Sequence, residues 1–224
     1  MLQIQYLLPI LTFWHTITTE VRKYKHDHSI ANNMVSAIHC VSYIVQYNIK
    51  PERNYTIHVS FGYYMYDLLY LLSALYWRKT PQIKQYIIFV IHHIIALYLL
   101  HIALTDHHRE LLLYAFYIGD LSNITLYTSY HVRKEYPDYR NTHRVIEFIQ
   151  LLWYSYFRVI RSTSLIFNDE MHLYNCSILY QSSVFLIYIM GLVFSATLLK
   201  KNIVNFMVLS GRITEKRTVN SANY

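Results

Sequence analysis

Ionisable side chains stand near the middle of long apolar stretches in this sequence. They are Asp67, the adjacent pair His92 and His93, and Asp120. A carboxylate beside an imidazole orients the ring and tunes its pKa, and such an imidazole serves as a general base or a nucleophile. Asp67, His92, His93 and Asp120 are therefore the predicted catalytic residues. Because adjacent helical residues point about 100° apart, we expect one histidine to react or bind and the other to be held by a neighbouring group.

A second group of polar residues is expected to contact a substrate. It comprises His39, Asn123, Tyr127 and Arg158, each of which also lies within an apolar stretch. Asn123 and Tyr127 follow Asp120 at helical spacing, so these three side chains share one helical face.

The sequence predicts no metal site. Its two cysteines, Cys40 and Cys176, are far apart, and no Cys-x-x-Cys motif occurs. The His-Asp-His run at 26–28 and the Asp-His-His run at 106–108 offer ligand atoms, but both lie in polar connections. That position favours solvated loops over metal ligands.

The apolar stretches that carry these residues are long enough to span a bilayer. A helix needs roughly 20 mainly apolar residues to cross about 30 Å of hydrocarbon. Five stretches fit this length, and the first two along the chain are shorter. In chain order the seven are Leu2–Thr18, Asn33–Tyr47, Ile57–Trp77, Gln82–Leu104, Leu111–His131, Val145–Phe167 and Leu173–Leu199. The predicted fold is all-α, a transmembrane bundle of about seven helices.

Lys and Arg are distributed unevenly among the connections. One alternating set, with the C-terminal tail, holds fifteen of them: Arg22, Lys23, Lys25, Arg78, Lys79, Lys84, Arg133, Lys134, Arg140, Arg144, Lys200, Lys201, Arg212, Lys216 and Arg217. The other set holds only Lys50, Arg53 and Arg109. Because cytosolic connections are rich in Lys and Arg, the N-terminus is predicted outside and the C-terminus in the cytosol. The Asn-x-Thr/Ser sequons at Asn54 and Asn175 then lie on the outer side, where glycosylation occurs.

Charged residues inside such helices are costly. A central Asp or Arg costs about 2.5–3.5 kcal/mol on an insertion scale, so Asp67, Asp120, Arg158 and Arg161 together cost roughly 10–14 kcal/mol if unpaired. We therefore expect these groups to converge inside the bundle, with the acids pairing with the arginines, or to line a wet cavity. The alternative is a hydrogen-bond network that only holds the helices together.

The overall composition agrees with a membrane protein. Hydrophobic residues make up 54% and charged residues 15%, against about a quarter charged in typical soluble domains. The net charge of +7 is spread between apolar stretches without forming a patch, which excludes a nucleic-acid partner. The expected partners are membrane lipids and the bilayer, and a homo-oligomer is left open.

The chain divides into three parts. Residues 1–32 form the first transmembrane helix and a basic connection, 33–199 the main transmembrane domain, and 200–224 a basic cytosolic tail. The apolar N-terminus lacks a basic n-region and a small-residue cleavage site, so we expect it to be retained as a helix.

Five short motifs follow one another inside the apolar stretches. They are Asn-Met-Val-Ser-Ala-Ile-His at 33–39, Gly-Tyr-Tyr-Met-Tyr-Asp at 62–67, Ile-His-His-Ile at 91–94, Gly-Asp-Leu-Ser-Asn at 119–123 and Tyr-Phe-Arg-Val-Ile at 156–160. In this order they resemble the TLC family of multi-pass membrane proteins, named for TRAM, Lag1 and CLN proteins. The resemblance runs from about Asn33 to Leu199. It departs from the ceramide synthases of that family at Gly119, where they carry His, and at Asn123, where they carry a second acid.

The resemblance implies a lipid-related function in the endoplasmic reticulum. Our first hypothesis is a TLC-type protein whose intramembrane His/Asp site takes part in lipid, including sphingolipid, synthesis or sensing, or in control of membrane composition. A second is a ceramide-synthase-like N-acyltransferase, with acyl-CoA as co-substrate and no further cofactor. A third is a proton or metal transporter using the same His and Asp residues, which the absence of an inverted repeat disfavours.

Overall fold

Helices account for all the regular structure in the part of the chain that is described. A computed structural model describes residues 4–25, 27–49, 53–78, 83–105, 109–168 and 176–210. The helices are α1 (Ile4–Tyr24), α2 (His28–Ile49), α3 (Arg53–Arg78), α4 (Ile83–Thr105), α5 (Arg109–Glu135), α6 (Arg140–Ser155), the π-helical segment η1 (Tyr156–Arg161), α7 (Ser162–Phe167) and α8 (Ile178–Leu209). Because α6, η1 and α7 follow without a break, these residues form seven helical rods.

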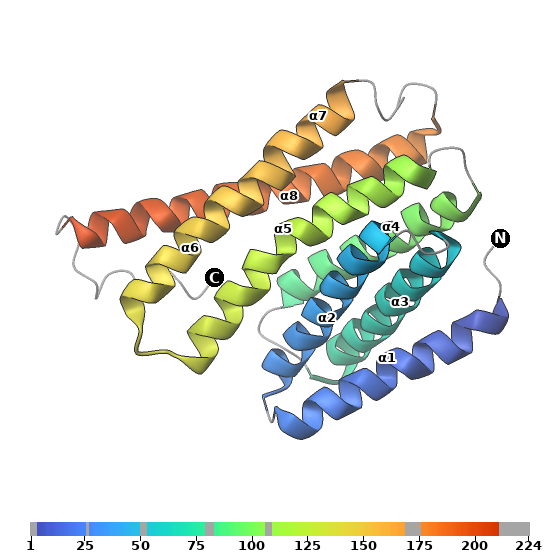
Figure 1. The fold of residues 1–224 in the computed structure, drawn as a ribbon, viewed down its shortest axis with the longest axis horizontal. Helices are drawn as coiled ribbons and strands as arrows, with labels where there is room; N and C mark the ends of the chain where they lie inside the picture. The colour runs from blue at the N-terminus through green and yellow to red at the C-terminus, as the bar shows by residue number, and fades with distance from the viewer. Residues whose placement is uncertain are drawn as a thin grey trace.

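Successive rods run in opposite directions across the bundle (Figure 1). α3 packs between α1 and α4, and α2 packs on α5. The rod made of α6, η1 and α7 lies against both α5 and α8. The helix ends that precede and follow the basic connections therefore gather at one end of the bundle, and the remaining ends gather at the other.

The all-helical bundle predicted from the sequence is confirmed, and each helix extends beyond its predicted apolar stretch at one end or both, although α8 begins at Ile178 rather than at Leu173. The second helix shows why, since α2 begins at His28 rather than at Asn33. The Oδ1 atom of Asp27 accepts hydrogen bonds from the backbone N–H of Ser29 at 2.8 Å and of Ile30 at 3.4 Å. This N-cap stabilises a polar first turn that hydropathy alone does not mark. The hydrogen bonds from Ser29 also hold the pKa of Asp27 below its usual value.

More helices are long enough to span a membrane than are clearly apolar enough to do so. The rods contain at least 21 residues each, which corresponds to about 31 Å at 1.5 Å per residue. Within the described residues, only Tyr86–Leu104 and Ile178–Leu209, with mean hydropathies of 2.3 and 2.1, are also clearly apolar enough to cross a membrane. Large apolar side chains nevertheless lie exposed along the other rods, among them Leu8, Val41, Leu69 and Leu152.

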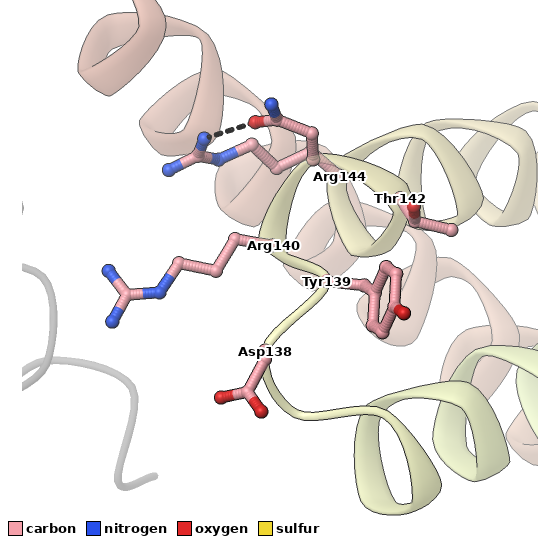
Figure 2. Close-up of a pocket in the computed structure, with 6 residues that line it drawn as sticks. Asp138, Tyr139, Arg140, Thr142 and Arg144 are labelled. Atoms are coloured by element: carbon pink, nitrogen blue, oxygen red, sulfur yellow. Dashed lines mark hydrogen bonds between the residues drawn. The ribbon is translucent and has the colours of Figure 1, made fainter.

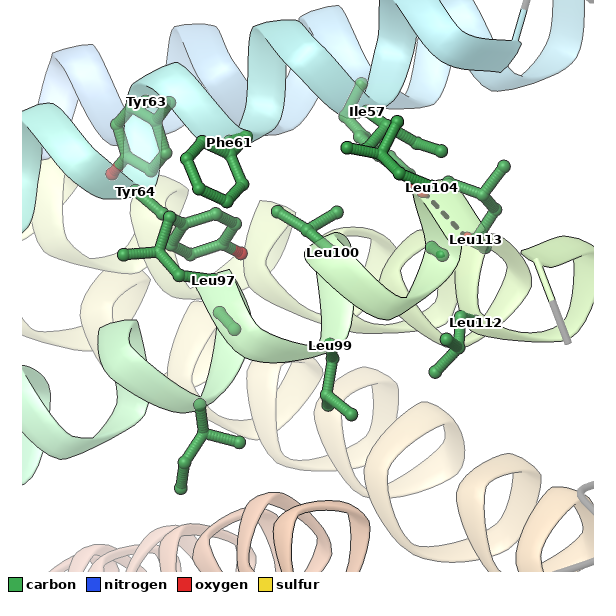
Figure 3. Packing of buried hydrophobic residues seen from close by; sticks show 14 of the residues in the cluster. Ile57, Phe61, Tyr63, Tyr64, Leu97, Leu99, Leu100, Leu104, Leu112 and Leu113 are labelled. Carbon is green, nitrogen blue, oxygen red and sulfur yellow. Dashed lines mark hydrogen bonds between the residues drawn. The ribbon is translucent and has the colours of Figure 1, made fainter. Parts of the chain in front are cut away.

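The main core lies where α3, α4 and α5 meet (Figure 3). α1 joins this core through Trp14, which is fully buried. Its indole Nε1 donates to the Val59 carbonyl at 3.0 Å. The two helices approach closely because Gly62 has no side chain, as a Cβ there would lie 2.1 Å from Cγ2 of Ile10.

Candidate functional site

The two adjacent histidines of α4 have different surroundings. His93 is buried and its Nε2 lies 2.8 Å from Oδ2 of Asp67 on α3. Its Nδ1 lies 2.7 Å from the Phe89 carbonyl oxygen one turn earlier in α4. A backbone carbonyl only accepts hydrogen bonds, so Nδ1 carries the proton and donates it. Both ring nitrogens of His93 are thus occupied by neighbouring groups.

His92 lines an internal cavity instead. The two imidazole centroids are 5.5 Å apart and the ring planes are 84° apart. The cavity has a volume of about 100 Å³ and lies among α3, α4, α5, the η1–α7 segment and α8. No hydrogen bond of His92 occurs among the described residues, so its nitrogens are available to a bound molecule.

The cavity has a polar part and an apolar part at different depths. Most polar lining residues lie near the middle of their rods: Tyr64, His92, Asp120, Asn123 and Arg158. Ser162 and Tyr188 also line the cavity. The apolar ones lie toward the end of the bundle opposite the basic connections: Leu99, Leu112, Ala115, Phe116, Leu165, Ile166, Val184 and Ile187. One end of a bound molecule would therefore contact polar groups, and the rest would contact hydrocarbon.

Asp120 and Arg158 face this cavity without forming an ion pair. Arg158 donates from Nε to the Ser122 hydroxyl at 2.8 Å and from Nη2 to the Gly119 carbonyl at 3.3 Å. Asp120 is 4% exposed, and its Oδ2 atom has no hydrogen-bond partner. Among the described residues, the expected pairing of the acids with Arg158 is therefore not found. Asp67 pairs with His93 instead, and two neutral oxygens of α5 satisfy part of the guanidinium.

Two glycines and a widened helix create the space for Arg158. A Cβ at Gly119 would lie 3.4 Å from Arg158 Nη2, and one at Gly191 would lie 3.4 Å from its Cδ. The side chain thus passes between α5 and α8 where neither helix has a side chain. Arg158 belongs to the π-helical segment, a rare geometry that often occurs at functional positions.

The other predicted substrate-binding residues are divided between two places. Asn123 lines the cavity together with Asp120. His39 lies outside it, where its Nε2 is 3.1 Å from Ser60 Oγ and its ring stacks on Tyr63 at 3.9 Å. Tyr127 lies on α5 and is not among the residues that line the cavity.

Tyr64 lines the cavity but was not predicted from the sequence. Its ring makes edge contacts with His93 at 5.3 Å and His92 at 6.3 Å. The i, i+3 spacing from Tyr64 to Asp67 was an available signal, but tyrosines are too frequent here to be distinguished by spacing.

A wider hollow lies outside the bundle, at the start of α6 (Figure 2). It is open and has a volume of about 410 Å³. Arg144 donates to Asn141 Oδ1 beside it at 3.1 Å. None of the predicted site residues lines it.

The described residues contain no cluster of three metal-ligating side chains. His26 and the run 106–108, considered above as ligands, lie outside the described residues. Asp27 is exposed and bonds to Ser29.

The different surroundings of the two histidines predict different effects on stability. His93→Ala removes two hydrogen bonds and leaves the Asp67 carboxylate without its partner, so we expect a loss of roughly 1–3 kcal/mol. His92→Ala removes a side chain without hydrogen bonds and should cost under about 1 kcal/mol. Thermal unfolding of the purified variants measures both. An equal or larger loss for His92→Ala would contradict this assignment.

Comparison with known proteins assigns the chain to a family. A search of curated proteins and a search of solved structures each found no match. The family model described as the TLC domain matches residues 28–210. The match covers most of the chain, including every residue that lines the cavity. The chain therefore belongs to the TLC domain family, whose members are membrane-associated and have lipid-related functions.

Proposed function

We propose that the cavity holds a lipid with its polar end beside His92 and Asp120 and its chain toward the apolar end. The observation that carries this proposal is the division of the cavity. Most of its polar groups gather at mid-helix, and mainly hydrocarbon side chains line the rest. Small-molecule sites commonly combine an apolar wall with a few convergent polar groups. The space of about 100 Å³ suits a lipid head group and the first carbons of its hydrocarbon chain. A longer chain would fit only if the lining side chains moved apart.

We also propose that all seven rods cross the membrane of the endoplasmic reticulum, with the basic connections in the cytosol. The length of each rod and the exposed apolar side chains support this arrangement. The lower hydropathy of several rods follows from the polar groups that they direct inward, such as Asp120, Glu147 and Gln150. In this orientation the apolar end of the cavity lies in the lumenal half of the bilayer.

Labelling of introduced cysteines tests the orientation. In a Cys176→Ser background, Ser210→Cys lies at the exposed end of α8 and Asn54→Cys at the exposed start of α3. A membrane-impermeant maleimide should label Ser210→Cys in intact microsomes, and Asn54→Cys only after permeabilisation. The reverse pattern, or labelling of both in intact microsomes, would contradict the proposal.

The chemistry that this site supports is proton transfer or covalent acyl transfer at His92. An imidazole without a hydrogen-bonding neighbour can attack a carbonyl or accept a proton from a substrate group. The enzymatic form of this proposal is a ceramide-synthase-like transfer, in which the acyl group leaves the sulfur of acyl-CoA for the nitrogen of an amine, and CoA departs as the free thiol with the amine proton. The favouring observation is that His92 and Asp120, from two different helices, line the same cavity. Lipid binding without catalysis, in sensing or in control of membrane composition, uses the same cavity.

Lipid mass spectrometry of expressing cells tests the proposed site. We expect the protein to change the cellular lipid profile, and we expect His92→Ala or Asp120→Ala to reduce that change at least about tenfold if either group acts on the reacting atoms. His101→Ala, an exposed histidine on the same helix, is the matched control and should retain the effect. Variants are compared at equal protein level. A lipid change that survives both cavity substitutions would contradict a role for this site.

A further inference from the structure

We propose that the hollow at the start of α6 binds an anionic phospholipid whose head group carries hydroxyl groups, such as phosphatidylinositol or phosphatidylglycerol. The hollow lies at the end of the bundle where the basic connections gather, and it shares no lining residue with the cavity around His92. The proposal therefore goes beyond the lipid site described above. It uses the proposed membrane-spanning arrangement only to place the lipid in the cytosolic leaflet, which contains anionic lipids.

Two arginines supply the positive charge of the hollow. Arg140 and Arg144 line it and are four residues apart, so they lie on the same side of α6. Both side chains extend toward the side of the connection on which Asp138 lies (Figure 2). Arg144 is held there by Asn141, whose Oδ1 accepts from its Nη1 at 3.1 Å. Because a guanidinium can donate two parallel hydrogen bonds to a phosphate, this pair of arginines suits a phosphate group.

The charge of the hollow matches a single negative charge. Among the lining residues, Asp138 contributes one carboxylate against the two guanidinium groups. It is exposed, and an exposed carboxyl is ionised at neutral pH. The other carboxylate of α6, Glu147, is buried and lies 2.6 Å from Lys201 Nζ. One net positive charge therefore remains at the hollow, which a phosphodiester with its single negative charge would balance.

Asp138 also gives the hollow a group that suits hydroxyls rather than phosphate. A carboxylate accepts hydrogen bonds and repels phosphate oxygens. Hydroxyls of a head group can donate to Asp138 while the phosphate contacts Arg140 and Arg144. The volume of about 410 Å³ leaves room for such hydroxyls beside the phosphate. A phosphodiester with a polyol uses all three charged groups, whereas phosphatidic acid offers the phosphate without the polyol.

The surface of α6 beyond the hollow is apolar, which favours a lipid over a soluble phosphate. Phe148 and Leu152 continue the four-residue spacing of the two arginines, and they are 53% and 57% exposed. The rise from Arg144 to Leu152 is about 12 Å at 1.5 Å per residue. A lipid with its phosphate at the arginines would therefore lay an acyl chain on these two side chains. A soluble polyol phosphate would leave them uncovered.

Native mass spectrometry of the purified full-length protein, released from uncharged detergent at pH 7.5, tests the proposal. The lipid probes are phosphatidylinositol, phosphatidylglycerol, phosphatidic acid and phosphatidylcholine with identical acyl chains. We expect the first two to bind about tenfold or more tightly than phosphatidylcholine. They should also bind more tightly than phosphatidic acid, although its negative charge is at least as large. Glycerophosphoinositol, the soluble probe without acyl chains, should bind at least about tenfold more weakly than phosphatidylinositol.

Substitutions separate the roles of the three charged groups. Arg140→Gln combined with Arg144→Gln should lower phosphatidylinositol binding at least about tenfold, to the level of phosphatidylcholine. Asp138→Ala removes both the acceptor for hydroxyls and the repulsion of phosphate, so the preference for phosphatidylinositol over phosphatidic acid should disappear. Lys23→Gln removes an exposed charge near the C-terminal end of α1. It is the matched control and should leave the binding of all five probes unchanged.

Three results would overturn the proposal. The first is equal binding of the three anionic lipids, or tightest binding of phosphatidic acid, by the unmodified protein. The second is undiminished phosphatidylinositol binding by the double arginine variant. The third is binding of glycerophosphoinositol as tight as that of phosphatidylinositol, which would indicate a soluble ligand. Each would leave the function proposed for the cavity in place, because that function is tested by His92→Ala and Asp120→Ala.

Discussion

A charged group inside an apolar helical bundle needs a partner, and this constraint shapes the centre of the molecule. Asp67 is satisfied by His93. Arg158 is satisfied in part by oxygens of α5. Asp120 is left with an unpaired oxygen atom beside the cavity. If the bundle only needed to be held together, an Arg158–Asp120 ion pair would satisfy both groups at once. Because Asp120 and Arg158 remain apart, both keep polar atoms at the wall of the cavity.

The surrounding helices are built to preserve that separation. Gly119 and Gly191 provide the passage for the Arg158 side chain, which belongs to the π-helical segment. A contrasting carboxylate occurs at the basic end of the bundle, where Glu147 is buried against Lys201 at 2.6 Å and Asn205 at 2.9 Å. That carboxylate is fully engaged and closes α6 against α8. The bundle therefore contains both a fully satisfied carboxylate that holds helices together and incompletely satisfied polar groups that face a cavity.

The sequence predicts the bundle well because length and periodicity are local properties. It also identifies His92, Asp120, Asn123 and Arg158, which the structure brings together around one cavity. It does not distinguish His92 from His93, since the rotation of α4 is determined by its packing on α3 and α5. Nor does it predict the π-helical segment or the glycine passage, because both depend on contacts between helices far apart in sequence. His39 shows the opposite case: a central histidine whose stacking on Tyr63 places it outside the cavity.

Photo-crosslinking with a bifunctional palmitoyl lipid, carrying a diazirine in its acyl chain, tests the central claim most directly. If a lipid occupies the cavity, mass spectrometry should find the crosslinks on apolar lining residues such as Leu112, Leu165 and Val184. A cavity blocked by Gly119→Leu, at a glycine that lines it, should lose them. Crosslinks confined to outward-facing residues such as Leu179 and Ile189, and unaffected by that substitution, would contradict the account.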